Sequence, residues 1–339
     1  MKFRLDPTDL QALYAEVGQP LRLSRVACRA EALNVLPEML HGWPQVLIVE
    51  DDTDMRRGDN DLKPLVHQLL EGHGFEVAVV ELRGSEGEAL STTPQHISRV
   101  VGELRSGQAV LALGSGTITD ITKHAVYLYE SEPGRSPPLL VGVPTANSVV
   151  AYASSLAVVL KGGVKRTLPS RLPDALVLDT QTLGDAPYAY RLGGVGDCSV
   201  VMTSFADLYL ASVTGMGRWS DTSWEVVQDL RVLFLGRSPT LADRGIVGAE
   251  VLGKAITLGG IAMTYAGESA PLSGYEHVIS HMLDMSARHF GRPVGNHGSQ
   301  CGLGTMLTAV AYQRLLADCG RVGSTSMRAT PVKRRCRLG

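Results

Sequence analysis

Residues 109–123 read AVLALGSGTITDITK. An apolar run enters a turn at Gly114 and Gly116, and a helical segment follows. Glycines let the backbone approach a ligand closely, and a helix N-terminus offers free N–H groups and a dipole that favours anions. Ser115 and Thr117 add hydroxyl groups. The stretch predicts a strand, a turn and a helix that either bind a nucleotide phosphate or form a plain glycine-rich turn.

Similar apolar runs lie on both sides of this stretch and predict a parallel sheet. The expected strands are 45–50, 74–81, 139–143 and 175–179, with helices over 62–72 and 93–106 between them. Strands that alternate with helices of ten to fifteen residues are typical of βαβ units. We expect an α/β, Rossmann-like domain over residues 1–185.

The pattern changes beyond residue 185. Apolar faces at helical spacing predict five helices, over residues 192–214, 222–235, 246–266, 274–290 and 299–318. We expect an all-α C-terminal domain over 186–320 that is incomplete at its C-terminal end. Residues 321–339 carry six basic side chains and no acidic one. This segment is either an aberrant or disordered tail or a basic tail for an anionic partner.

Composition excludes several classes of protein. The chain has 339 residues, 44% hydrophobic and 19% charged, which is typical of a globular protein with a sizeable core. A net charge of −2 argues against a nucleic-acid partner. Five cysteines are scattered without a CxxC motif, and the chain starts without an apolar leader, so we expect a cytoplasmic protein without a disulfide framework.

One uncharged stretch, residues 136–160, is long enough to cross a bilayer. It is interrupted by Pro137, Pro138, Pro144 and Asn147. We therefore expect a buried strand, a loop and a second extended segment there, and no membrane insertion.

Two further loops follow predicted strands. Thr145 and Ser148 lie directly after strand 139–143, and Asp51 follows strand 45–50. Because the carboxyl ends of parallel strands meet at one edge, these loops would flank the turn at residues 114–117. The hydroxyl groups would suit a nucleotide, and Asp51 would either accept from a ribose hydroxyl group or lie in a solvated loop.

The helical half contains a set of metal-ligand residue types. His277 and His281 lie four residues apart, on one helix face, and His297 starts another predicted helix. Asp197 follows a run of glycines. One carboxylate and two imidazoles would leave an open position on zinc for water or substrate. The alternative is that these are ordinary surface or core side chains.

Several segments together resemble the sn-glycerol-1-phosphate dehydrogenases, a branch of the iron-containing alcohol dehydrogenase and glycerol dehydrogenase superfamily. The segments that carry the resemblance appear in the family's order: GSGTITD (114–120), PTAxS (144–148), YASS (152–155), GGVKRTLPSRLPDALVLD (162–179), GGVGD (193–197), SGYEHVISH (273–281) and HGSQCGLGT (297–305). The resemblance implies a dehydroquinate synthase-like fold, in which a cleft between the two domains holds NAD or NADP and a metal. Zinc is the expected metal, with Fe²⁺ and Ni²⁺ as alternatives.

The resemblance also implies roles for individual residues. The metal ligands would be Asp197, His277 and His297, and His281 would face the substrate as a catalytic residue together with Asp197. The nucleotide would be bound by Asp51, Gly114, Ser115, Gly116, Thr117, Ile118, Thr145, Ser148 and Ser154. Lys165 and Arg166 fall close to where the family would bind a phosphate.

The chain departs from the family pattern PTAPSxDG(Y/F)AS in residues 144–154. Asn147 replaces the proline, Val150 the substrate-contacting aspartate, and Ala151 the glycine. Losing one matched polar contact costs about 1–3 kcal/mol and can change substrate choice.

We therefore expect a metal-dependent NAD(P) oxidoreductase acting on a small polyol or its phosphate, such as sn-glycerol-1-phosphate and glycerone phosphate. By resemblance it would form a homo-oligomer. Two alternatives remain: an NAD- and zinc-dependent sugar-phosphate cyclase of the dehydroquinate synthase type, and a truncated, non-catalytic paralogue. Asp51 favours NAD, because a carboxylate repels a 2′-phosphate, but Arg56 and Arg57 are close to it in sequence.

Overall fold

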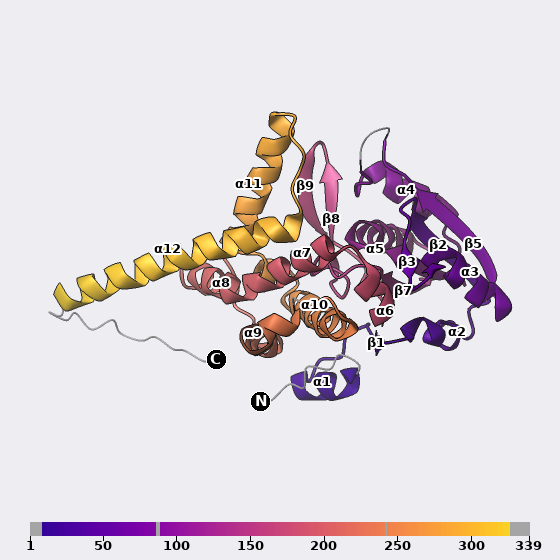
Figure 1. Cartoon of the computed structure of the whole chain (residues 1–339), viewed down its shortest axis with the longest axis horizontal. Helices are drawn as coiled ribbons and strands as arrows, with labels where there is room; N and C mark the ends of the chain where they lie inside the picture. The colour runs from indigo at the N-terminus through magenta and orange to yellow at the C-terminus, as the bar shows by residue number, and fades with distance from the viewer. Residues whose placement is uncertain (1–8, 86–88, 242, 326–339) are drawn as a thin grey trace.

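The computed structural model describes residues 9–85, 89–241 and 243–325 (Figure 1). Most of the predicted basic tail, residues 326–339, lies outside this range. Its first five residues, 321–325, continue the last helix, which runs past the end predicted for it at residue 318.

The N-terminal half is built on a six-stranded parallel sheet with the strand order β1-β10-β7-β6-β2-β5. Its strands are β1 (Arg25–Arg29), β2 (Gln45–Asp51), β5 (Glu76–Leu82), β6 (Ala109–Gly114), β7 (Leu139–Pro144) and β10 (Ala175–Asp179). The five predicted strands are confirmed. Strand β1 was not predicted, because its few apolar residues lie between arginines at a sheet edge where alternate side chains are exposed.

Helices cover both faces of the sheet (Figure 1). One apolar cluster joins the sheet to α2 (Leu36–Met39) and α3 (Leu62–Gly72). A second joins the opposite face to α4 (Pro94–Glu103) and α5 (Gly116–Glu130). Strand β6 is buried along its whole length, as expected for a central parallel strand, so its last residues are held rigidly where α5 begins.

Smaller elements complete this half. A short helix α1 (Leu10–Val17) and the 3₁₀ turn Ala32–Val35 lie near the start of the described chain, and β3 (Arg56–Arg57) pairs with β4 (Asn60–Asp61). An antiparallel hairpin consists of β8 (Leu156–Lys161) and β9 (Val164–Pro169). The prediction for residues 136–160 is therefore confirmed: β7, a loop and β8 follow one another.

The second half is helical. Its helices are α6 (Thr180–Asp185), α7 (Tyr188–Ser199), α8 (Ser204–Val213), α9 (Asp221–Leu241), α10 (Ile246–Ala266), α11 (Tyr275–His289) and α12 (His297–Thr325). The single helix predicted over 192–214 is wrong, because a 3₁₀ turn at Val200–Met202 divides it into α7 and α8. A second 3₁₀ turn, Ala270–Leu272, precedes α11.

Glycines let α7 and α12 pack backbone to backbone. A Cβ atom on Gly196 would lie 2.2 Å from the carbonyl oxygen of Gly298, and one on Gly298 would lie 1.9 Å from that of Gly193. No side chain fits at these positions, so the axes approach closely. The crossing sets Asp197, the next residue on α7, beside His297 at the start of α12.

Among the described residues, α10 alone is long and apolar enough to cross a membrane, and 72% of its apolar window is buried inside the protein. It packs in the main core together with β10 and β1. We interpret α10 as the core helix of the helical half.

Candidate metal centre and nucleotide site

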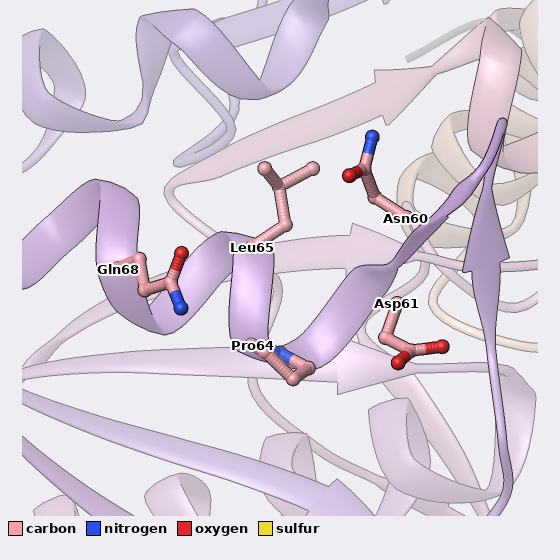
Figure 2. A pocket seen from close by; sticks show the side chains of 5 residues that line it. All are labelled: Asn60, Asp61, Pro64, Leu65 and Gln68. Atoms are coloured by element: carbon pink, nitrogen blue, oxygen red, sulfur yellow. The ribbon is translucent and has the colours of Figure 1, made fainter.

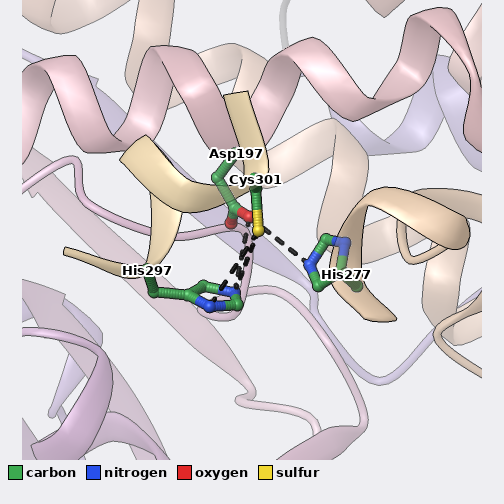
Figure 3. A group of neighbouring side chains, drawn as sticks. All are labelled: Asp197, His277, His297 and Cys301. Carbon is green, nitrogen blue, oxygen red and sulfur yellow. Dashed lines mark hydrogen bonds and ion pairs between the residues drawn. The ribbon is translucent and has the colours of Figure 1, made fainter. Parts of the chain in front are cut away.

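Four potential metal ligands converge where α7, α11 and α12 meet (Figure 3). Asp197 comes from α7, His277 from the first turn of α11, and His297 and Cys301 from the first two turns of α12. Their ligand atoms all lie within 4.8 Å of one another. The structure thus brings together the three ligands expected from the sequence. Sequence reasoning missed Cys301, although its spacing of four from His297 on a helix was a usable signal.

The distances fit a divalent metal. Asp197 Oδ1 lies 3.6 Å from His277 Nε2 and 3.7 Å from His297 Nε2. Two donors that bind one zinc ion tetrahedrally lie about 3.3–3.6 Å apart. Asp197 Oδ1 is also buried without a hydrogen-bond partner, whereas Oδ2 accepts from the backbone N–H of Val150 at 2.7 Å. A buried, unpaired carboxylate oxygen that faces two imidazoles fits a cation.

Neighbouring side chains aim both imidazoles at Asp197. His277 Nδ1 lies 3.2 Å from Glu276 Oε1, and His297 Nδ1 lies 3.1 Å from the Ser280 hydroxyl oxygen. Such partners fix the ring orientation of metal-binding histidines and leave Nε2 for the metal. Burial lowers the pKa of His297 to about 4, so its imidazole is neutral near pH 7.

His281 lies beside this group. Its ring centroid is 6.4 Å from those of His277 and of His297. Burial, then His277 and Lys165, lower the pKa of His281. The ammonium of Lys165 reaches the same region from β9, where it pairs with Asp284 at 2.7 Å. The structure therefore places a neutral imidazole and a cation next to the group of metal ligands.

The predicted phosphate loop ends β6 and starts α5. Ser115 is the N-cap residue and makes no capping hydrogen bond with its side chain, so the first-turn N–H groups from Gly116 to Ile118 have no side-chain cap. A Cβ atom on Gly116 would lie 2.7 Å from Val149 Cγ2. Gly116 is therefore needed for the close approach of the loop that follows β7. Ile118 is fully buried, so only its backbone can contribute to a ligand site.

The other expected nucleotide residues surround this loop at the carboxyl edge of the sheet. Asp51 ends β2, and Thr145 and Ser148 follow β7, the two strands that flank β6. Thr145 donates its backbone N–H to Gly114 O at 3.2 Å. Ser154 lies at the far end of the loop, buried, and its hydroxyl oxygen accepts from Leu156 N at 3.0 Å.

Charges around Asp51 bear on cofactor choice. Its carboxylate lies 3.7 Å from Lys63 Nζ. Arg57 is held by Asp179, with Nε 3.0 Å from Oδ1, and Arg56 is held by Asp61. Both arginines near Asp51 in sequence therefore already have acidic partners.

The loop after β7, residues 145–155, touches both halves of the site. Lys123 Nζ, on α5, donates to Ala151 O at 2.8 Å, and Asn147 Nδ2 donates to Ala249 O at 2.7 Å. Because Val150 N also donates to Asp197, this loop connects α5 to one of the potential metal ligands. Val150 itself packs into the core against Gly259, so its side chain is not free to meet a substrate.

A separate pocket lies at the start of α3 (Figure 2). It is lined by Asn60, Asp61, Pro64, Leu65 and Gln68. It contains none of the residues expected at the site, and we assign it no role.

Comparisons with known proteins first show what the chain is similar to. Residues 28–187 match the family described as iron-containing alcohol dehydrogenase. Glycerol dehydrogenase from Schizosaccharomyces pombe shares the fold, with a TM-score of 0.61 at 16% identity over 88% of this chain and 73% of that one. A 2-deoxy-scyllo-inosose synthase also shares it, with a TM-score of 0.59 at 14% identity over 91% of this chain and 82% of that one. These likenesses confirm the predicted fold class.

The sequence relatives are more specific. Glycerol-1-phosphate dehydrogenase [NAD(P)+] from Halalkalibacterium halodurans is 29% identical over 298 residues, which cover 87% of this chain and 72% of that protein. Glycerol-1-phosphate dehydrogenase [NAD(P)+] from Bacillus subtilis is 26% identical over 318 residues, which cover 92% of this chain and 78% of that protein. The resemblance found in the motifs is confirmed: the chain is similar to the glycerol-1-phosphate dehydrogenases, within the iron-containing alcohol dehydrogenase superfamily.

Proposed function

We propose that this protein is a metal-dependent NAD(P) oxidoreductase that interconverts a small polyol phosphate and its ketone, with sn-glycerol-1-phosphate and glycerone phosphate as the substrate pair. One observation carries the proposal: the loop at residues 145–155 contacts both the start of α5 and Asp197. The same loop therefore borders both the helix N-terminus proposed to bind phosphate and the group of proposed metal ligands. The names of the sequence relatives support the same reaction.

Each part of the site has a role in this reaction. When bound, the metal supplies a Lewis acid for the carbonyl oxygen and the nicotinamide supplies the hydride. Asp197, His277 and His297 hold the metal, and zinc suits their oxygen and nitrogen donors. His281 lies beside them, where its imidazole can take a proton from the alcohol or return one to the ketone oxygen. Lys165 lies in the same region, but its ammonium is already paired with Asp284, so it has no assigned role in binding the substrate phosphate.

The nucleotide lies along the carboxyl edge of the sheet in this proposal. The first turn of α5 binds its pyrophosphate, and Thr145, Ser148 and Ser154 line it. Asp51 accepts from the adenosine ribose and disfavours a 2′-phosphate. Because Arg56 and Arg57 already have acidic partners, we expect NADH to be preferred over NADPH.

The cell compartment is proposed from the sequence and the assembly from the resemblance. We propose a cytoplasmic homo-oligomer. An exposed apolar stripe on α12 supports self-association: Leu303, Met306, Leu307 and Val310 recur at helical spacing and are each at least 46% exposed.

The proposed function is tested by following NADH absorbance with purified, zinc-loaded protein and glycerone phosphate. We expect NADH to be consumed, and NADPH more slowly. His277→Ala and His297→Ala should each abolish turnover, because each removes an imidazole that holds the metal in place for the substrate. His41→Ala changes an exposed histidine outside the site and should leave the rate unchanged.

Two results would contradict the proposal. Unchanged turnover in His277→Ala would remove the metal assignment. Binding of NADH and zinc without net NADH oxidation on any ketone would favour the cyclase alternative, because a cyclase returns its NAD unchanged. Binding of neither would favour a non-catalytic paralogue.

A further inference from the structure

We propose that Cys301 supplies a fourth, sulfur ligand to the metal, so that the metal-loaded protein without substrate has a closed Asp-His-His-Cys site. This rests on the metal of the proposed function. It goes beyond the three ligands that the family resemblance implies, which leave the fourth position open.

The sulfur lies among the three donors that would hold the metal. Cys301 Sγ lies 3.6 Å from His297 Nε2, and it belongs to the set of four donors that all lie within 4.8 Å of one another (Figure 3). A nitrogen and a sulfur bound tetrahedrally to one zinc ion, at about 2.1 and 2.3 Å, lie about 3.6 Å apart. The distance from Cys301 Sγ to His297 Nε2 thus already has the length that a shared zinc ion requires.

The helix packing holds Cys301 in this place. It lies one turn after His297 on α12, so both side chains project from the same face. It is fully buried, and the next residue, Gly302, packs against the backbone of Gly196 on α7. The glycine crossing that sets Asp197 beside His297 therefore also fixes the cysteine side chain against the carboxylate.

Other buried cysteines of the described chain do not share this environment. Cys198 is as fully buried as Cys301 and lies next to Asp197 in sequence, but it is not among the clustered donors. Burial and proximity in sequence alone therefore do not bring a thiol to the site. Cys301 reaches the site because it lies one helical turn after His297 on the same helix face.

A sulfur donor would change which metal the protein selects. Thiolates bind soft or borderline ions such as zinc more strongly than hard ions such as Mg²⁺ and Mn²⁺. Four protein ligands are also typical of closed zinc sites, which hold their metal firmly. Catalytic zinc can expand to five ligands, so four protein ligands still leave room for the Lewis-acid role in the proposed function. The chain should therefore retain zinc strongly and discriminate against hard divalent ions.

The test is X-ray absorption at the zinc edge of the full-length, zinc-loaded protein without substrate. We expect one sulfur neighbour at about 2.3 Å. The sulfur shell should disappear in Cys301→Ser and Cys301→Ala and persist in Cys198→Ser, the matched control. Zinc affinity, measured by competition with a chelating dye, should fall about 10- to 100-fold in Cys301→Ala, whereas Mn²⁺ affinity should change little.

Cobalt gives a second readout that needs no activity. Co²⁺ bound to the wild-type protein should show a thiolate charge-transfer band, and Cys301→Ser should keep bound Co²⁺ but lose that band. Near-equal melting temperatures of the metal-free Cys301→Ser and wild-type proteins would show that the variant folds.

Each contrary outcome has a distinct meaning. Zinc bound by nitrogen and oxygen alone in the wild type would overturn the role of Cys301 and leave the three-ligand site of the proposed function intact. A sulfur shell that persists in Cys301→Ser would overturn it as well. Failure of the wild type to bind zinc or cobalt at all would overturn both this site and the metal-dependent function.

Discussion

Val150 shows how one residue can have a different meaning in a sequence and in a structure. In sequence it replaces an aspartate that contacts substrate in the family. In the structure its side chain packs against Gly259 in the core, while its backbone N–H binds Asp197 Oδ2. The contribution of this position to the site is therefore made by the backbone, which any residue other than proline would supply.

Restoring the aspartate should therefore harm the protein. We expect Val150→Asp to lower the free energy of unfolding by about 2–3 kcal/mol, because it buries a carboxylate without a partner. Urea unfolding measures this change. Val150→Ala is the control for lost volume alone, at about 2 kcal/mol. A fully stable Val150→Asp with raised kcat/KM for glycerone phosphate would show that the side chain reaches the substrate.

Among the helices, the crossing of α7 and α12 positions the potential metal ligands. A methyl group on Gly196 would collide with the carbonyl oxygen of Gly298, so Gly196→Ala should force the helices apart. We expect a loss of about 1–3 kcal/mol in stability and weaker zinc binding, because Asp197 moves away from His297. Calorimetry and a zinc competition assay measure the two effects.

Gly102→Ala is the matched control for that substitution. Gly102 lies in α4, and nothing approaches within 4 Å of the position a methyl group would take. The Gly102→Ala variant should have a free energy of unfolding about 0.4–1 kcal/mol higher, because alanine reduces the conformational freedom of the unfolded chain. Unchanged zinc affinity in Gly196→Ala would mean that the crossing does not position the ligands.

A buried ion pair within α5 also holds the elements beside it: Lys123 donates to Ala151 O in the loop at residues 145–155. Lys123 is completely buried, 3.3 Å from Asp120 Oδ1, and Asp120 Oδ2 accepts from Val158 N at 3.0 Å. Burial lowers the pKa of Lys123 and raises that of Asp120, so each depends on the other for its charge.

Removing the charge of Lys123 alone should lower the stability more than removing the charges of both Lys123 and Asp120. We expect Lys123→Met to lose about 3–5 kcal/mol of stability, because it leaves Asp120 buried without its cation. The double variant Lys123→Met/Asp120→Asn should recover part of that loss. Urea unfolding of the wild type, both single variants and the double variant measures the coupling, and additive losses would show that the pair is not coupled.

The whole molecule exposes apolar surface along its last helix. The C-terminal half of α12 extends beyond the helices it packs on (Figure 1), with Leu315 and Leu316 49% and 71% exposed. An unsupported helix in water is marginal, and a stripe of this kind favours association.

We therefore expect light scattering after size exclusion to give at least twice the chain mass of 36.2 kDa. Met306→Lys together with Val310→Lys should shift the protein towards the monomer, because charges in an apolar interface cost desolvation energy. Leu128→Lys, on exposed α5 surface, is the control and should not change the mass. A monomeric wild type would contradict self-association.

Much of the fold could be predicted because its signals are local. The five predicted strands are short apolar runs with helices between them. Four of them, β2, β6, β7 and β10, lie inside the sheet, where burial on both faces makes such runs easy to recognise. Strand β1 and the 3₁₀ break at Val200–Met202 could not be predicted, because neighbouring elements rather than local periodicity decide them.

The sequence by itself determined the kind of chemistry: a glycine turn before a helix, hydroxyl groups after the next strand, and carboxylate and imidazole donors in the helical half. These features depend only on residue types and on the order of the motifs, both of which the sequence contains directly. The tertiary structure alone shows that Asp197 is held by Val150 N–H, that Cys301 lies among the potential ligands, and that Arg56 and Arg57 are already paired. These contacts join residues that are distant in sequence or lie on crossing helices, and local patterns do not encode such distances.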